Sequence, residues 1–94
     1  MTRLFLRIEV TLENVKTSEK TTDISKYVDD IEYWYKSHNA FQDYFRIDHL
    51  ENNVFKINAN NEYVNLNDED ELIIEDVHYK VYSKVVFGTK INSV

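Results

Sequence analysis

Apolar and polar side chains alternate strictly over residues 3–12, and this pattern constrains the fold more than any other. A period of two in hydrophobicity predicts a β-strand with one buried face, and the β-branched residues within the run favour the same conformation. Such a strand needs another element to cover its apolar side. The side chains that would form the buried face are Leu4, Leu6, Ile8, Val10 and Leu12.

An amphipathic helix over residues 23–38 is the element that can cover this strand. Apolar side chains recur there at the i, i+3, i+4 and i+7 spacing that places them on one helical face. A side-chain oxygen of Thr22 or Asp23 is expected to accept a backbone N–H and cap the N-terminus, and Asn39 is the expected end of the helix. The apolar face would consist of Ile24, Tyr27, Val28, Ile31, Trp34, Tyr35 and His38.

Short β patterns occupy most of the remaining chain. Strands are predicted at residues 45–49, 54–57 and 77–87, and a further strand is left open at residues 62–66. The polar residues 13–22 form either a loop or a short second strand in a hairpin with the first, and the pattern does not separate these two structures.

The end of the chain combines an acidic loop with the last strand. Residues 67–71 are predicted to be a solvated loop, and residues 72–74 a brief buried stretch. The last strand is expected to end at Gly88, with residues 89–94 as a loose tail.

These elements together predict a single α+β domain over residues 1–94. One amphipathic helix would pack on one face of a largely antiparallel sheet of about four to five strands. A β-grasp-like and a ferredoxin-like layout both fit the order of elements, although the latter needs a second helix that the pattern lacks. Both layouts place the first and last strands side by side.

Composition restricts the compartment and the chemistry. Cysteine is absent, which excludes a disulfide framework and a thiolate zinc site. Arg7 and Glu9 interrupt the apolar N-terminal stretch, so we do not expect a signal peptide, and no run approaches the ~18 apolar residues of a membrane span. We therefore expect a cytoplasmic protein without membrane association. Ten Asn, eight Lys and eight Ile residues indicate an AT-rich coding sequence, which favours a bacterial or phage origin.

Motifs for catalysis and metal binding are missing, so we predict neither an enzyme nor a cofactor nor a metal. The sequence contains no phosphate-binding glycine loop, no nucleophile elbow and no HExxH motif. His38, His49 and His78 fall on different elements, and we interpret them as unrelated. The alternating oxygen ligands of residues 65–71 resemble a calcium loop only loosely, because its turn-forming glycine is absent.

The net charge of −6 conceals a segregation along the chain. Residues 1–8 and 77–94 carry five basic side chains and no acidic one, whereas residues 9–76 carry all 17 acidic side chains and six basic ones. An acidic surface steers a basic partner toward it, and an exposed Tyr among acids is a typical interface anchor. We expect such a surface on the helix and the acidic loop, formed by Asp29, Asp30, Glu32, Tyr33, Asp68, Glu69, Asp70 and Glu71.

The hypothesis that follows is a small non-enzymatic module that binds a basic protein surface. Toxin-immunity proteins and phage-encoded nuclease inhibitors have this general character, so an inhibitor or immunity role is its sharpest form. That likeness concerns the class of protein and not the sequence. An acidic surface that serves only solubility is the alternative interpretation, and homo-oligomerisation is left open.

Single-stranded nucleic-acid binding is the second hypothesis. If the terminal strands are neighbours, their outward faces form one patch of cations and aromatic rings, which can hold phosphates and stack bases. The acidic remainder of the chain would repel a polyanion, so nucleic acid is the less favoured partner. A structural subunit of a larger assembly is the third hypothesis. The nucleic-acid patch would comprise Arg3, Phe5, Arg7, Lys80, Tyr82 and Lys84.

Overall fold

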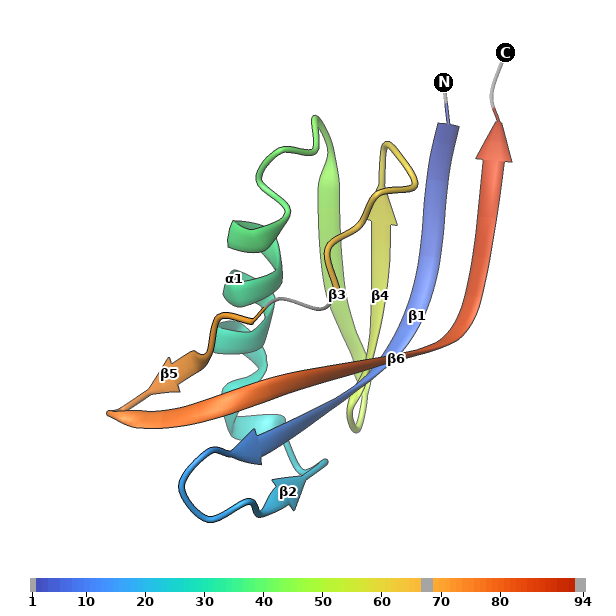
Figure 1. The fold of residues 1–94 in the computed structure, drawn as a ribbon. Coiled ribbons are helices and arrows are strands. Elements are labelled where there is room, and N and C mark those ends of the chain that lie inside the picture. The colour runs from blue at the N-terminus through green and yellow to red at the C-terminus, as the bar shows by residue number, and fades with distance from the viewer. Residues whose placement is uncertain (1, 67–68, 93–94) are drawn as a thin grey trace.

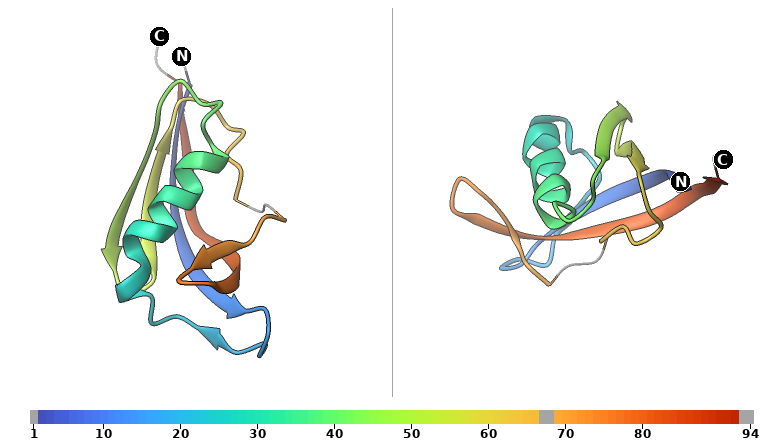
Figure 2. Two further views of the ribbon diagram at one scale, coloured as in Figure 1. Left: turned by 90° about the vertical axis from the view of Figure 1, so that its left-hand side faces the viewer. Right: turned by 90° about the horizontal axis from the view of Figure 1, so that it is seen from above.

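The computed structural model describes residues 2–66 and 69–92, and it confirms the α+β class. Within these residues, one α-helix lies across one face of a curled antiparallel sheet (Figure 1, Figure 2). The strand order is β3-β4-β1-β6-β5, with β2 paired to β1 beside this path. The elements are β1 Thr2–Asn14, β2 Lys20–Thr21, a 3-10 turn Ser25–Tyr27, α1 Val28–His38, β3 Phe45–Glu51, β4 Val54–Ala59, β5 Leu72–Ile74 and β6 Val77–Asn92.

The sheet has six strands, because the segment after β1 does form a hairpin with it and residues 72–74 pair with the start of β6. The expected contact between the first and last strands is also confirmed, since β1 pairs with β6 along its whole length. The choice between a β-grasp-like and a ferredoxin-like layout stays a prediction.

Strand β1 is the centre of the sheet and supplies much of the core. It pairs with β4 over its first half, with β2 near its end, and with β6 throughout. Because alternate side chains of a strand point to opposite faces, the predicted apolar set lies on the helix side. Leu6, Ile8, Val10 and Leu12 are all buried, and three of them are fully inaccessible to solvent.

The helix begins later than the sequence pattern predicts. A 3-10 turn occupies Ser25–Tyr27, and α1 follows from Val28, with Asp29 and Asp30 in its first turn. Neither Thr22 nor Asp23 caps it: the residues preceding the 3-10 turn and α1 are Ile24 and Tyr27, and neither helix start has a side-chain cap. The prediction of the cap is therefore wrong, because the chain turns tightly before the helix and places apolar side chains at both starts.

The helix ends at Asn39 as expected, and this side chain also organises the following loop. Asn39 is fully buried, and its Nδ2 donates to the carbonyl oxygens of Tyr35, at 2.8 Å, and Asn65, at 3.0 Å. Its Oδ1 accepts the backbone N–H of Asn65 at 2.6 Å. Residues 62–66, which we left open as a strand, are consequently an irregular segment whose backbone is held by side-chain amides, including that of Gln42 on Tyr63.

Strand β6 is longer and less regular than predicted. It continues past Gly88 to Asn92, so the loose tail is wrong for residues 89–92, while residues 93 and 94 lie outside the described part. The register shifts where Arg7 faces Phe87 and the next residue of β1 faces Val85. Val86 is therefore an extra, bulged residue, and the alternation predicted through Phe87 is broken.

Truncation of Ile31 should test how strongly the helix is held on the sheet. Ile31→Ala removes a fully buried side chain and leaves a cavity, so the free energy of unfolding should fall by about 2–5 kcal/mol. Tyr33→Ala is the control, because this neighbour is 74% exposed. Urea unfolding followed by Trp34 fluorescence measures both, and equal losses in the two variants would contradict the packing of α1.

A second test uses alkaline pH and the buried Tyr35. Burial raises the pKa of Tyr35 from 10.0 to about 12, although its hydrogen bond with Ser83 works in the opposite direction. Above pH 10, the unfolded chain loses this proton more readily than the folded one. Stability is therefore fully present below pH 10 and is lost as the pH rises toward 12, by about 3 kcal/mol from this group.

Comparison with Tyr35→Phe isolates that contribution from the other groups that titrate at high pH. Urea unfolding at pH 8, 10, 11 and 12 should show a steeper loss in the wild type than in the variant. Parallel curves would mean that the hydroxyl of Tyr35 ionises as easily in the folded protein as in the unfolded chain.

Candidate functional site

The acidic side chains of α1 divide between two sides of the helix. The inward positions are taken by Ile31, Trp34 and Tyr35, so the helix presents Asp29, Asp30 and Tyr33 to solvent, while Glu32 is half-buried. With 100° per residue, Asp30 and Tyr33 lie on the same side as Ser37, whereas Glu32 is about 140° away from Ser37 around the axis. The structure thus brings only part of the predicted helix surface toward the acidic loop.

The acidic loop lies against the end of α1 in an open hollow of about 760 Å³. Asp68 lies outside the described residues. Two histidines that we had interpreted as unrelated meet here, each beside a carboxylate. His38 Nε2 is 3.3 Å from Asp70 Oδ2, and His78 Nδ1 is 2.6 Å from Glu71 Oε2. The hollow is lined by Ser37, His38, Glu69, Asp70, Glu71, Ile73 and His78.

The interpretation of the three histidines as unrelated is therefore wrong for His38 and His78, which line the same hollow. His49 is elsewhere, with its Nε2 2.7 Å from the carbonyl oxygen of Asn52 in the β3–β4 turn. A His–carboxylate pair can bind and release a proton, but the neighbouring hydroxyl of Ser37 donates to the carbonyl of Trp34 at 2.9 Å and so is engaged within the helix. Chemically, the hollow offers carboxylates and imidazoles to a cation.

The β5–β6 hairpin, whose Ile73 and His78 line this hollow, projects from the body of the molecule (Figure 1) and ends in an unusual turn. Ile74 faces Val77, so only Glu75 and Asp76 form the turn, and both have positive φ, 48° and 66°. Such two-residue turns favour Asn and Gly, because other side chains are strained in the left-handed region. Strained residues of this kind cluster at binding and catalytic sites. Two carboxylates are held at the tip at a cost in stability.

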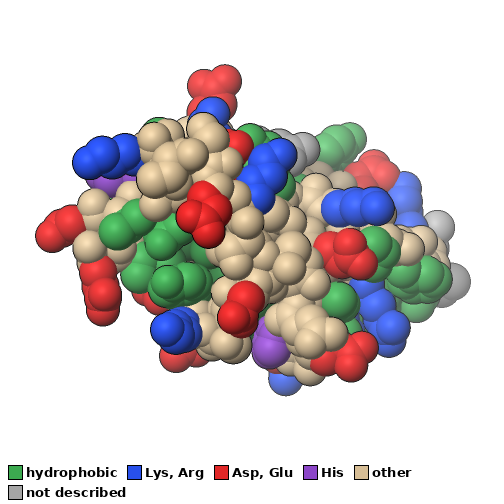
Figure 3. All heavy atoms as spheres, turned by 90° about the horizontal axis from the view of Figure 1, so that it is seen from below, with side chains coloured by type: hydrophobic (Ala, Val, Ile, Leu, Met, Phe, Trp, Pro, Cys, Tyr) green, Lys and Arg blue, Asp and Glu red, His purple; other side chains and the backbone are tan. Residues whose placement is uncertain are grey.

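Apolar side chains flank these acids. Ile73 is 56% exposed, Val77 37% and Val15 39%. Val15 lies at the hairpin because its backbone N–H donates to the carbonyl of His78 at 3.0 Å. Seen from below, hydrophobic side chains gather at the end of the molecule occupied by the β5–β6 hairpin, with acidic and basic side chains around them (Figure 3). An apolar centre with a charged rim is the usual anatomy of a protein interface.

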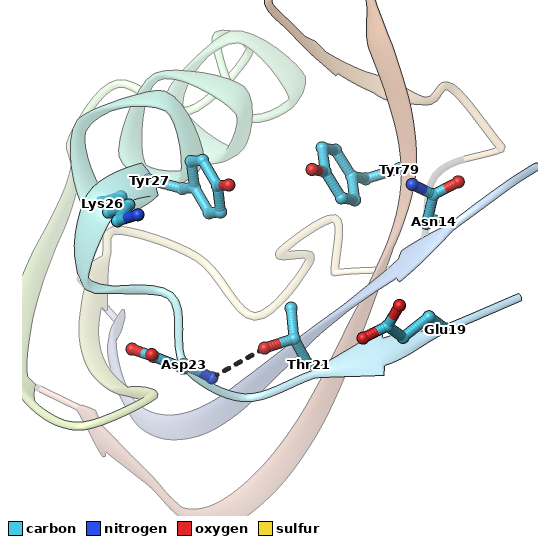
Figure 4. A pocket seen from close by; sticks show the side chains of 7 residues that line it. All are labelled: Asn14, Glu19, Thr21, Asp23, Lys26, Tyr27 and Tyr79. Atoms are coloured by element: carbon cyan, nitrogen blue, oxygen red, sulfur yellow. Dashed lines mark hydrogen bonds between the residues drawn. The ribbon is translucent and has the colours of Figure 1, made fainter. Parts of the chain in front are cut away.

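A smaller hollow of about 300 Å³ lies between the start of the helix, the β1–β2 hairpin and β6. Two half-buried rings, Tyr27 and Tyr79, form one wall, with their centroids 5.9 Å apart and their planes tilted by 41°. Below the rings, as Figure 4 shows, lie Glu19, Thr21 and Asp23. Sequence analysis missed this site, because its residues come from three elements whose meeting depends on the pairing of β1 with β6.

The predicted nucleic-acid patch is divided by the antiparallel register. Next to Arg7, Phe5 and Arg3, strand β6 places Phe87, Thr89 and Ile91. Arg3 also lies over a ring outside the predicted patch, with its guanidinium carbon 4.7 Å from the centroid of Tyr44. The two strands are neighbours as expected, but the three predicted residues of β1 do not pair with the three predicted residues of β6.

The β6 half of that patch is instead paired with residues farther along β1. Lys80, Tyr82 and Lys84 face Glu13, Thr11 and Glu9, respectively. Tyr82 donates its hydroxyl to Glu13 Oε2 at 3.0 Å, and this hydrogen bond raises the pKa of Tyr82. Lys20 Nζ covers the Tyr82 ring at 5.3 Å. The prediction of one continuous basic and aromatic patch is therefore wrong, because two of its three β6 residues face acids.

Comparison with known proteins gives no relative: no family model, no curated protein and no solved structure matches the chain. Among the described residues, no helix has the length and apolar character needed to cross a membrane. The same part of the chain contains no group of three or more His, Asp or Glu side chains arranged to hold a metal ion.

Replacing the two residues of the strained β5–β6 turn should test how much stability the turn costs. Changing Glu75→Asn and Asp76→Gly together supplies the residues that tolerate positive φ, so the free energy of unfolding should rise by about 1–2 kcal/mol. Asn52→Gly is the control, since Asn52 also has a positive φ, 47°, but already tolerates it. Urea unfolding measures both changes. An unaltered or lower stability in the double variant would show that the turn carries no strain.

Proposed function

We propose that this protein is a non-enzymatic protein-binding module that engages a basic protein surface. The acidic end of the molecule would make the contact, through the exposed side of α1, residues 69–71 and the tip of the β5–β6 hairpin. An inhibitor or immunity role in a bacterial or phage setting, in the cytoplasm, is the specific form of this proposal. The acids of this end would accelerate encounter with a basic partner.

The observation that carries the proposal is the grouping of acids from two separate segments around the β5–β6 hairpin. Asp70 in the loop and Asp76 in the hairpin turn line two hollows that share Glu71 and His78. Asp30 lies about two turns earlier on α1, on the same side of the helix as Ser37, which lines the first of these hollows. Exposed Ile73 and Tyr33 accompany them. Solubility alone requires charge, but it does not require two acids in a strained turn or apolar side chains between the acids.

Single-stranded nucleic-acid binding is the second candidate, and one observation supports it. Arg3, Phe5 and Arg7 share one side of β1, and the half-exposed Phe87 faces Arg7 from β6. Against it, Lys80 and Lys84 face acids, which lowers the positive potential that phosphates would meet. A structural role in an assembly, including a homo-oligomer, rests on the exposed apolar side chains of β6 at Val85, Val86, Phe87 and Ile91.

Charge reversal at the acidic end should test the first proposal. The variant Asp30→Lys, Asp70→Lys, Asp76→Lys, immobilised as bait, should capture its partner from bacterial lysate at least about tenfold more weakly than the wild type, mainly through slower association. Glu32→Lys is the control on the same helix, because it lies away from the hollow, and it should have a smaller effect. Salt should weaken capture by the wild type.

Two variants of the terminal strands test the alternative of nucleic-acid binding. Arg7→Ala and Lys80→Ala should leave protein capture unchanged, and a labelled single-stranded oligonucleotide should not bind the wild type at physiological salt. Oligonucleotide binding that Arg7→Ala abolishes and that the acidic reversals strengthen would overturn the proposal in favour of nucleic acid. Capture that survives all three reversals would overturn it as well.

A further inference from the structure

The hollow beneath Tyr27 and Tyr79 is separate from the open hollow at the acidic loop and has a different chemistry. Strand β1 contributes Asn14 to it, the β1–β2 hairpin contributes Glu19 and Thr21, and β6 contributes Tyr79. Asn14 and Tyr79 are the last register partners of the β1–β6 ladder, so the ladder itself fixes one wall. This wall is therefore set by the most extensive pairing in the fold, whereas Glu19 belongs to the turn between β1 and β2.

Its lining is rich in hydrogen-bond acceptors and in π surface. Glu19 and Asp23 both line the hollow below the two phenol rings. Glu19 turns its carboxylate toward the rings, whereas the carboxylate of Asp23 points away from Glu19 (Figure 4). In the described part of the chain, the Glu19 carboxylate forms no ion pair within 4.0 Å, and Asp23 accepts only the hydroxyl of Ser25 at 3.2 Å. Carboxylates opposite aromatic faces are the surroundings that a cation prefers.

The electrostatics of the rings fit the same ligand. The neighbouring hydroxyl of Tyr27 raises the pKa of Tyr79, and burial and the carboxylate of Glu75 raise it further. Tyr79 therefore keeps its proton, and the negative charge of Glu75 in the hairpin turn acts on its hydroxyl. A cation bound beside these rings would be favoured by the same charges that disfavour a phenolate.

The volume limits what can enter. A hollow of about 300 Å³ is at the lower end of the range for small-molecule sites, so it suits a single side chain or a small amine and not a nucleotide or a large cofactor. Asn14 belongs both to this hollow and to the one that Asp76 and Val77 line, so a partner seated on the hairpin reaches it.

Two features oppose a cation and shape the test. Lys26 lines the hollow, although Figure 4 places its side chain beyond Tyr27, on the opposite side from Glu19. The helix also begins here, and its dipole is positive at this end, but Asp29 and Asp30 in the first turn offset it. Removal of the Lys26 charge should consequently strengthen cation binding, which a site for an anion would not show.

We propose that this hollow binds the guanidinium group of an arginine side chain. Arginine fits better than lysine, because a planar guanidinium stacks on a Tyr face while its N–H groups bond the carboxylate of Glu19 in a fixed geometry. The assignment of this arginine to the basic partner rests on the proposed function; the guanidinium site itself does not. The arginine would anchor the partner beside the acidic β5–β6 hairpin.

The experiment is a titration of the ¹⁵N-labelled protein with N-acetyl-arginine-methylamide, followed by amide chemical shifts. Shifts should concentrate at residues 14, 19–23, 27 and 79, with an affinity on the order of millimolar. The lysine analogue should bind about threefold or more weakly. Shifts spread over all acidic surfaces, or equal binding of the two analogues, would overturn the proposal.

Variants of similar charge identify the residues responsible. Glu19→Gln should weaken binding of the arginine analogue at least about fivefold, and Lys26→Gln should strengthen it. Glu51→Gln is the control, since it removes the same charge from an exposed position on β3 and should change nothing. Tyr79→Leu should weaken binding, with its stability checked by urea unfolding. Equal effects of Glu19→Gln and Glu51→Gln would show that only net charge matters, and would overturn the site.

Two further experiments distinguish a failure of the arginine site from a failure of the proposed protein-binding function. The double reversal Asp70→Lys, Asp76→Lys should weaken partner capture and leave arginine-analogue binding within about twofold, because those side chains do not line the hollow. If capture is lost in that variant but Glu19→Gln captures normally, the proposed function stands and the anchor is wrong. If free arginine binds far more tightly than its blocked analogue, the assignment to a partner's side chain is overturned, since the hollow would then recognise the amino acid itself.

Discussion

The pairing of β1 with β6 is the interaction on which the rest of the structure depends. It runs from Thr2 and Asn92 at one end to Asn14 and Tyr79 at the other. Strand β1 needs β6 on one edge because β4 and β2 satisfy only the other edge. The buried face of β1, completed by this pairing, is the surface on which the helix rests. The end of the ladder at Asn14 and Tyr79 places the residues of β1 and β6 that line the hollows of the candidate site.

This ladder also redistributes the charge that the sequence segregates. The basic terminal segments appear in the sequence as a separate positive region, but in the fold Lys80 and Lys84 face Glu13 and Glu9 across the strands. Opposite charges at paired positions stabilise a sheet modestly and cancel at a distance. Among the acids that this ladder does not pair are those of the helix, of residues 69–71 and of the hairpin turn.

Regular hydrophobic patterns made the central elements predictable. The alternation from Leu4 to Leu12 specifies which side of β1 is buried, and the helical spacing specifies the inward face around Ile31. Both follow because the buried face of a strand or helix requires apolar side chains at the period of that element. The candidate site was harder to predict from the sequence. His38 and His78 line one hollow because of where β5 and β6 lie relative to α1, and nothing in the local sequence encodes that arrangement.

The remaining differences come from residues that break a pattern. Glu75 and Asp76 gave no turn signal, because the residues that favour such a turn are Asn and Gly. Val86 bulges out of an otherwise continuous strand, and a single inserted residue inverts the side to which Phe87 points. Asn39 takes the backbone of residue 65 away from strand pairing by bonding it with a side chain. Each of these is a tertiary effect on a short segment.

The place of β1 in the sheet has a consequence for biosynthesis. Within this domain, β1 leaves the ribosome before every other element, while its longest partner, β6, leaves last. The helix and the β3–β4 hairpin are local and can form early, but the centre of the sheet stays incomplete until residues 77–92 emerge, and pairings over such long sequence separations form slowly. A nascent chain therefore displays the apolar face of β1 during most of its translation. The hollows around Tyr79 and the acidic hairpin are completed in the final step, so a stalled or truncated chain would carry the acids of the helix without the rest of the proposed binding surface.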